Sequence, residues 1–146
     1  MEKQLKVIFS LKQDEDDYPG FASESVWALA TADASVVQID NIPFFTYAAT
    51  LDDLIRVRNE DGQLWFEDVH KASANSLVRV VFFKEEAKDN VKDVLVRLGC
   101  RAEYFAQRKL LAVSVPSAKL LPLVREFLEN EVQAGNIDYE EAIVRE

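Results

Sequence analysis

The sequence predicts an α+β protein, with an N-terminal antiparallel β meander over residues 1–75 and a C-terminal ferredoxin-like unit over residues 76–146. In the first part, apolar and polar residues alternate in short runs between turn residues, which is the pattern of half-buried strands. In the second part the apolar period changes twice to that of a helix, at residues 87–98 and 121–134. Strands flank these helices in the order β-α-β-β-α-β, which is typical of a ferredoxin-like unit.

The meander is predicted from its alternation and its turns. Its first strand alternates from Leu5 to Leu11, and Pro19-Gly20 marks the loop that follows. Gly62, in a Glu-Asp-Gly turn, supplies the positive φ that a tight hairpin needs. Pro43 is tolerated at the first position of a strand. We expect a small curved sheet or partial barrel, with strands at residues 5–12, 24–31, 35–40, 43–50, 54–59 and 63–72.

The second part is predicted from two amphipathic helices and the residues that end them. Gly99 ends the first helix and Gly135 the second. Pro122 would break an interior turn, so the second helix should begin near Leu121, with Pro122 at its first position. Because no linker separates the two parts, we expect one compact domain, in which a continuous or shared sheet is plausible. The remaining apolar runs predict strands at residues 76–83, 101–106, 109–115 and 137–144.

Composition and charge exclude several classes of protein. The chain has 146 residues, of which 49% are hydrophobic, enough to fill a core. No apolar run approaches the roughly 20 residues that cross a bilayer, and the N-terminus lacks a signal-peptide pattern, so we expect a cytoplasmic protein without a membrane partner. Cys100 is the only cysteine, which excludes an internal disulfide and fits a reducing compartment. A formal net charge of −9 disfavours nucleic-acid binding.

Residues for the common catalytic chemistries are scarce. His70 is the only histidine, and we expect it to be a surface or half-buried residue of a strand rather than part of a triad with Cys100 or a serine. One cysteine and one histidine cannot form a structural zinc site, and the carboxylates lack the spacing of a calcium loop. Four separated glycines exclude a phosphate-binding loop. We therefore expect no metal, no cofactor and no catalytic residue.

Cys100 follows the end of a predicted helix. A helix C-terminus carries the negative end of the dipole, which does not lower the pKa of a thiol. We therefore expect Cys100 to be a small, half-buried apolar residue.

Several runs of the sequence together resemble one bacterial family. The most specific run is Asp40 to Phe45, DNIPFF, and the others are ESVWALA, LDDLIRV, DGQLWF, SLVRV, LLAVSVP and YEEAI. On these runs, which extend from Glu24 to Ile143, the chain resembles the domain-of-unknown-function family 4265. The family has no established activity. The resemblance implies a bacterial, cytoplasmic, single-domain protein, and small acidic proteins of this kind are often immunity partners of polymorphic or type VI toxins.

The chain departs from the family pattern at two places. Asp52 stands where a glycine is expected, and residues 73–75 are Ser-Ala-Asn where Ser-Gly-His is common. The absence of that histidine argues against a family-wide catalytic histidine at this point.

The leading hypothesis for function is a non-catalytic immunity protein that occludes the basic active-site cleft of a cognate toxin. Its acid clusters would complement such a cleft and raise the association rate. Exposed aromatic residues would anchor the interface. We expect a monomer or weak dimer when the protein is free. The candidate contact residues are Phe44, Asp40, Trp27, Tyr104, Tyr139, Asp14, Glu15, Asp16, Asp17, Glu140 and Glu141.

Two other functions stay open. The first is a small-molecule-sensing or regulatory module, since the apolar strand that contains Arg79 is compatible with a ligand on a sheet face. The second is a carboxylate-dependent enzyme that pairs Asp53 with Asp40 or Glu67, provided that burial separates their pKa values.

The run IDNIPFFTY, residues 39–47, raises the question of which aromatic residues are buried. Asp40 and Asn41 form a turn, and a strand that begins at Pro43 alternates its faces. We expect Phe45 and Tyr47 to be more buried than Phe44. Phe44, beside Asp40, is then the aromatic residue of this run that is left to meet a partner.

Overall fold

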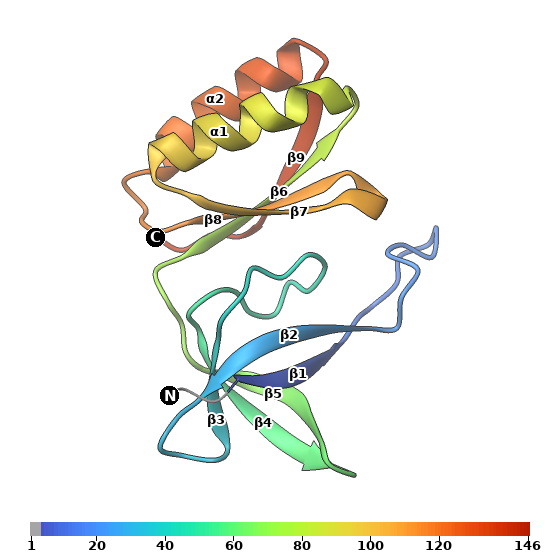
Figure 1. Cartoon of the computed structure of the whole chain (residues 1–146), viewed down its shortest axis with the longest axis vertical. Helices are drawn as coiled ribbons and strands as arrows, with labels where there is room; N and C mark the ends of the chain where they lie inside the picture. The colour runs from blue at the N-terminus through green and yellow to red at the C-terminus, as the bar shows by residue number, and fades with distance from the viewer. Residues whose placement is uncertain (1–3) are drawn as a thin grey trace. The chain divides into compact units, whose positions relative to one another are not determined.

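The computed structural model describes residues 4–146 and has an α+β fold. The chain forms two compact units, Met1–Ser73 and Ala74–Glu146, each with its own sheet and its own core (Figure 1). The continuous sheet that we considered plausible is therefore not formed by the described residues. None of the helices within residues 4–146 has the length and apolar character needed to cross a membrane.

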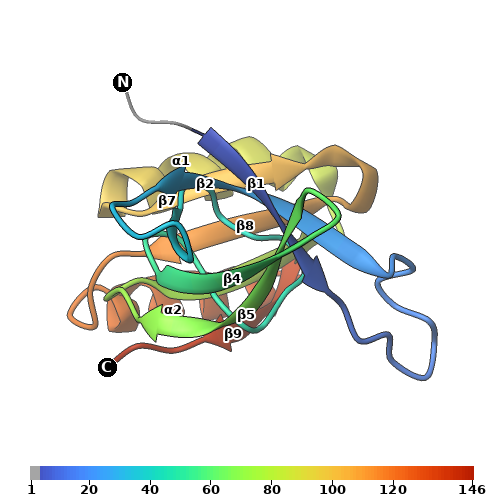
Figure 2. The same cartoon turned by 90° about the horizontal axis from the view of Figure 1, so that it is seen from below.

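The first unit is a five-stranded barrel, as the predicted curved sheet suggested, and its closure is complete. Neighbouring strands are antiparallel, except that the first strand pairs in parallel with the fifth, Val7 opposite Leu64. This parallel pairing joins the two ends of the meander, so the barrel has no free edge. β1 and β2 lie side by side in both views (Figures 1 and 2). The strands are β1 (Gln4–Ser10), β2 (Ser23–Ala30), β3 (Val36–Ile39), β4 (Leu54–Glu60) and β5 (Gln63–Lys71).

Alternating residues of these strands fill the barrel. Phe9 of β1 stacks on Phe66 of β5, with ring centroids 4.5 Å apart. Each fully buried aliphatic or aromatic side chain contributes about 1.5–3 kcal/mol to stability. The apolar residues of the alternating strands therefore face the inside of the barrel and form its core. The core consists of Val7, Phe9, Val26, Ala28, Val37, Ile39, Ile55 and Val57 from the strands, with Ala49 from the chain between β3 and β4.

The strand predicted at residues 43–50 is wrong. Between β3 and β4 the chain forms an irregular loop over residues 40–53. Phe45 is buried as expected, but Tyr47 exposes 59% of its surface and is more exposed than the half-buried Phe44. Alternation across a strand does not apply here, because the N–H groups of residues 44–46 are bonded to a carboxylate side chain rather than to a neighbouring strand.

The second unit has the element order β-α-β-β-α-β that we predicted from Ser76 onward. Its four strands form an antiparallel sheet in the order β7-β8-β6-β9, and both helices cover one face of that sheet (Figure 1). Two short 3₁₀ turns, Glu85–Ala87 and Ala106–Arg108, precede α1 and β8. The regular elements are β6 (Ser76–Phe82), α1 (Lys88–Leu98), β7 (Arg101–Phe105), β8 (Leu110–Val115), α2 (Leu121–Gln133) and β9 (Ile137–Ile143).

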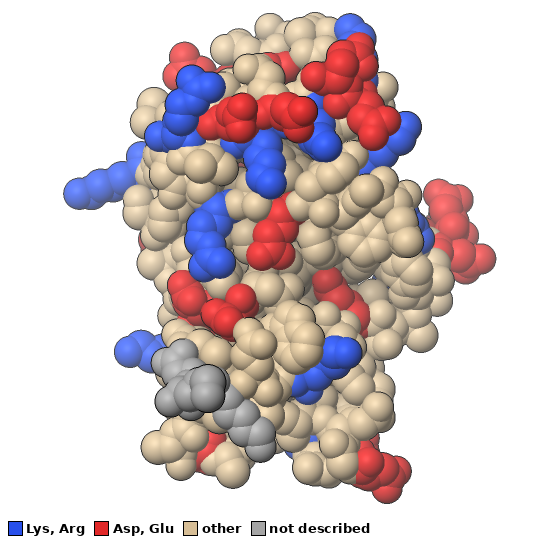
Figure 3. All heavy atoms as spheres, in the orientation of Figure 1, with Lys and Arg blue, Asp and Glu red and all other residues tan. Residues whose placement is uncertain are grey.

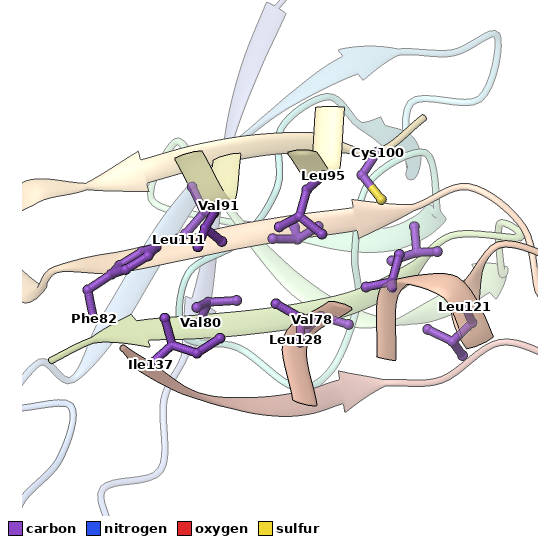
Figure 4. Packing of buried hydrophobic residues seen from close by; sticks show 13 residues of the cluster. Val78, Val80, Phe82, Val91, Leu95, Cys100, Leu111, Leu121, Leu128 and Ile137 are labelled. Atoms are coloured by element: carbon purple, nitrogen blue, oxygen red, sulfur yellow. The ribbon is translucent and has the colours of Figure 1, made fainter. Parts of the chain in front are cut away.

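Both helices begin and end where the sequence indicates. Gly99 caps α1 in the left-handed conformation, at φ 112°, and its N–H bonds back to the carbonyls of Leu95 and Val96. α2 begins at Leu121, with Pro122 in its first turn. Side chains from α1 and α2 point toward the sheet, and Val91, Leu95 and Leu128 are fully buried there (Figure 4).

Candidate functional site

The loop over residues 40–53, which we call the motif loop, is fastened to β2 by one carboxylate. Glu24 accepts the N–H of Phe44 at 2.6 Å on Oε2, and those of Phe45 at 3.1 Å and Thr46 at 3.0 Å on Oε1. Successive backbone N–H groups that converge in this way form a concave anion site. The chain supplies the anion itself, so Glu24 is a structural carboxylate.

The first residues of the motif loop are also bonded to β2. Asn41 Oδ1 accepts the N–H of Trp27 at 2.7 Å, and Asp40 donates its N–H to the carbonyl of Trp27 at 2.8 Å. The amide side chain of Asn41 thus pairs with β2 at the point where β3 ends.

Asp53 holds the other end of the motif loop. It is fully buried, and its carboxylate accepts the N–H of Thr50 at 2.9 Å and the N–H of Ser73 at 2.8 Å. Ser73 Oγ donates in turn to the carbonyl of Leu51 at 2.8 Å. A buried carboxylate with two backbone donors is satisfied by the fold.

The family departure at Asp52 has a backbone explanation. Asp52 has φ 68°, in the left-handed region that glycine enters at no steric cost. Asp and Asn are the residues that enter this region next most readily. Residue 52 therefore needs the left-handed conformation, which this chain adopts with Asp in place of the expected Gly.

The side chains considered for catalysis are bonded within the fold or lie on the surface. His70 is exposed on β5, where its Nδ1 lies 2.9 Å from Nη2 of Arg56, and Nη1 of Arg56 pairs with Asp68 at 3.0 Å. Glu67 is exposed on the same strand, whereas Asp53 is buried in the loop contacts above. Within residues 4–146, no three His, Cys, Asp or Glu side chains are grouped so that they could hold a metal ion.

Cys100 lies in the core of the second unit. It is buried, and burial raises the pKa of its thiol to about 11. The thiol is therefore neutral at physiological pH and a poor nucleophile.

The exposed aromatic surface of the first unit lies beside the motif loop. Tyr18 and Phe21, both exposed, pack edge-on against Phe45, with ring centroids 6.1 Å and 5.4 Å apart. Both belong to the connection between β1 and β2, which also contains the four acidic residues at 14–17. Asp14 Oδ1 accepts the N–H groups of Asp16 and Tyr18, both at 2.9 Å, which gives this segment a defined turn. We call residues 14–21 the acidic-aromatic loop.

Trp27 is an exposed aromatic residue of the barrel wall. It exposes 46% of its surface on β2, and Nζ of Lys6 lies 5.3 Å from its ring centroid. A lysine over an indole face is an attractive cation–π contact of about 0.5–1 kcal/mol at an exposed site.

The predicted contact residues divide between the two units. The first unit contains Trp27 and residues 14–17, which are exposed, and Asp40 and Phe44, which are half-buried. Sequence reasoning did not select Tyr18 and Phe21, although both flank the Pro19-Gly20 turn directly after the acid cluster.

The candidates of the second unit are engaged in contacts within that unit. Tyr104 packs against Phe82 and lies under the ammonium of Lys88, 4.6 Å from its ring centroid. The hydroxyl of Tyr139 donates to Glu129 at 2.6 Å, and burial raises its pKa to about 12. The remaining two candidates, Glu140 and Glu141, pair with Arg79 and Arg125 respectively.

Charge is unevenly divided between the units. Residues 1–73 contain 14 Asp and Glu but 6 Lys and Arg, a formal charge of −8. Residues 74–146 contain 12 Asp and Glu and 11 Lys and Arg, a formal charge of −1. Over the helical layer, side chains of both signs are interspersed (Figure 3). The excess negative charge thus belongs to the unit that contains the acidic-aromatic loop.

Comparison with known proteins identifies a family and a fold. A family model described as "Domain of unknown function (DUF4265)" matches residues 24–139. A solved structure titled "Novel crystal structure of a hypothetical protein from Neisseria gonorrhoeae" is similar, with a TM-score of 0.80 and 23% sequence identity. The match covers 100% of this chain and 97% of that chain, and at this identity it shows the fold alone. Among curated proteins, none matches the sequence.

Proposed function

The chain belongs to the DUF4265 family, a family of unknown function, and we propose that it is a non-catalytic protein whose first unit binds a basic protein partner. The observation that carries this proposal is the acidic-aromatic loop. Four consecutive exposed carboxylates at residues 14–17 adjoin the exposed rings of Tyr18 and Phe21. Aromatic side chains are enriched among the few residues that contribute most of the energy of a protein interface, and a charged rim favours a partner of opposite charge.

The chemistry of the loop indicates the kind of partner. A unit with a formal charge of −8 attracts a positively charged surface and repels a phosphate backbone. Positive clefts occur on enzymes that act on nucleic acids, so the partner we propose is a toxin of that class. The protein would then be a cytoplasmic immunity protein that covers the cleft of its cognate toxin.

The motif loop would support this surface rather than take part in chemistry. Glu24, Asn41 and Asp53 are bonded to backbone groups that shape the loop. Phe45 from that loop then supports Tyr18 and Phe21 from beneath. This arrangement favours a preformed binding surface, which reduces the entropy cost of association.

Co-expression with the product of the neighbouring gene tests the proposal. We expect that product to be toxic alone, to be neutralised by this protein, and to form a complex with it that weakens as salt is raised. The variant with residues 14–17 changed to Asn and Gln should associate more slowly. A non-toxic neighbour, or a toxic one that this protein neither binds nor neutralises, would contradict the proposal.

For the second unit we propose the ferredoxin-like class. The β-α-β-β-α-β order and the helices on one face of an antiparallel sheet support this assignment.

A further inference from the structure

The sheet of the second unit has two edge strands, β7 and β9, and the two edges differ. Each has a single neighbouring strand within the part of the chain that the structure describes. Figure 4 shows β7 following Cys100 at one edge and β9 beginning at Ile137 at the other. On β9, Asp138 Oδ1 accepts the N–H of Tyr139 at 2.9 Å, so a side chain occupies a backbone donor and adds a charge to that edge. The edge that stays open to a further strand is β7.

The outer edge of β7 presents the backbone of Ala102 and Tyr104. The N–H of Phe82 bonds to the carbonyl of Lys109 at 3.2 Å, so residue 109 and every second residue after it turn their backbone groups toward β6. The alternate residues of β8 turn toward β7, where they pair with residues 101, 103 and 105. Ala102 and Tyr104 therefore turn their N–H and C=O groups outward.

Two side chains of β7 carry opposite charges on the sheet face away from the helices. Ala102 and Tyr104 pack against the core beneath the helices, so Arg101 and Glu103 lie on the other face. Their cross-strand neighbours on β8 are a serine and an alanine, which are uncharged. Arg101 is exposed and Glu103 is half-buried, and neither forms an ion pair within residues 4–146.

A second copy of β7 matches these charges in one register. Two antiparallel copies pair through their outward residues. With Ala102 opposite Ala102 of the second copy, Arg101 lies opposite Glu103 in both directions. With Ala102 opposite Tyr104, Glu103 would lie opposite its own copy, and like charges directly opposite each other are destabilising. With Tyr104 opposite Tyr104, Arg101 would lie opposite Gln107, beyond the end of the strand.

We propose that the protein self-associates through β7, in a twofold dimer centred on Ala102 with reciprocal ion pairs between Arg101 and Glu103. The two four-stranded sheets then form one continuous sheet. Because β7 has five residues, the interface is small and the dimer is weak. This surface belongs to the second unit, and the partner proposed above binds the first.

An exposed apolar residue of α1 supports the same contact. Nζ of Lys88 lies 4.6 Å from the ring centroid of Tyr104, which places that side of α1 beside β7. Val96 lies on the same side of the helix, about two turns further along, and exposes 50% of its surface. Because the chain reverses at Gly99, Val96 lies near the start of β7. A second copy paired about Ala102 would cover it.

Sedimentation and cross-linking provide the test. Sedimentation of the full chain from about 10 μM to about 1 mM should show a weak monomer–dimer equilibrium. The amide NMR signals of residues 101–104 should shift over the same range. In a Cys100→Ala background, Arg101→Cys mixed with Glu103→Cys should form disulfides between unlike chains at least about tenfold faster than between like chains, because the register places these positions opposite each other.

Charge variants test the ion pairs. Arg101→Glu and Glu103→Arg should each weaken the dimer at least about tenfold, since each places like charges opposite each other. A mixture of the two variants should regain the association of the parent. Ala102→Pro removes the outward N–H but leaves the backbone bonds to β8, and it should also weaken the dimer. Lys119→Glu and Glu126→Arg, which make the same charge changes at exposed positions near or on α2, should have no effect.

Three results would overturn the proposal. The first is a protein that stays monomeric over the whole concentration range. The second is a dimer that Arg101→Glu weakens no more than Lys119→Glu does. The third is a mixture of the two charge variants that stays monomeric, although each melts at the temperature of the parent. If a charge variant unfolds, the cysteine mixture decides, because equal cross-linking of like and unlike chains contradicts the register. None of these results depends on whether a toxin binds the first unit.

Discussion

The carboxylate of Glu24 accepts the backbone N–H of Phe44 at 2.6 Å, across 20 residues of sequence. The next two backbone N–H groups bond to the same carboxylate, at 3.1 Å and 3.0 Å. Residues 44–46 therefore obtain from one side chain the hydrogen bonds that a strand would obtain from its neighbour.

Removal of this carboxylate should destabilise the first unit. Glu24→Ala leaves three backbone donors without their acceptor, and we expect a loss of about 2–4 kcal/mol in the free energy of unfolding. Glu24→Gln keeps one oxygen and should lose less. Urea unfolding measures the difference, with Ser25→Ala, on the exposed neighbour of Glu24 in β2, as the control. A loss below about 0.5 kcal/mol in Glu24→Ala would show that water replaces the carboxylate.

Substitution of Asp53 should cost more than substitution of its neighbour. Asp53 is fully buried with two backbone donors, whereas Asp52 is exposed. We expect Asp53→Ala to lose about 2–4 kcal/mol, because it leaves both donors unsatisfied and a cavity beside them. Asp52→Asn should stay within about 0.5 kcal/mol of the parent. Similar losses in both variants would contradict the role assigned to Asp53.

The conformation at residue 52 predicts a gain from glycine. Because Asp52 has φ 68°, Asp52→Gly should match or exceed the stability of the parent by up to about 1 kcal/mol. Asp52→Val, whose branched side chain resists this conformation, should lose about 1–2 kcal/mol. Thermal unfolding of the three proteins side by side checks the order. Equal melting temperatures for the valine and glycine variants would refute it.

The thiol of Cys100 should be unreactive in the folded protein. Burial raises its pKa to about 11 from 9.0, so the folded state holds the thiol proton more tightly than the unfolded state does. This contribution to stability is fully present below pH 9 and is lost as pH rises to about 11. Native protein at pH 8 should react slowly with a thiol reagent such as dithionitrobenzoate, and unfolded protein should react at once.

A comparison with Cys100→Ala isolates the thiol from the lysines and tyrosines that titrate in the same range. The difference in unfolding free energy between the parent and this variant should shrink from pH 9 to pH 11. A difference that does not change with pH would show that the thiol ionises alike in both states.

How far the sequence predicts the fold depends on the range of the interactions. The periods of 2 and 3.6 predicted β1 to β9 and both helices because they record which face of a local element is buried. Gly99 and Pro122 marked helix ends because their effects are local: glycine adopts a positive φ, and proline lacks the N–H that an interior helical residue donates. The motif of the family pointed to residues 40–45 but not to their structure.

By itself, then, the sequence determined the α+β class, the order of the elements in the second unit and the acidity of the first unit. The tertiary structure decided the conformation of the motif loop, because its hydrogen-bond acceptor, Glu24, lies far away in sequence. It also decided closure of the barrel, which rests on the parallel pairing of β1 with β5. The exposure of Tyr47 and the burial of Phe45 are set by the conformation of that loop. They do not follow from alternation, since residues outside a strand do not alternate between two faces.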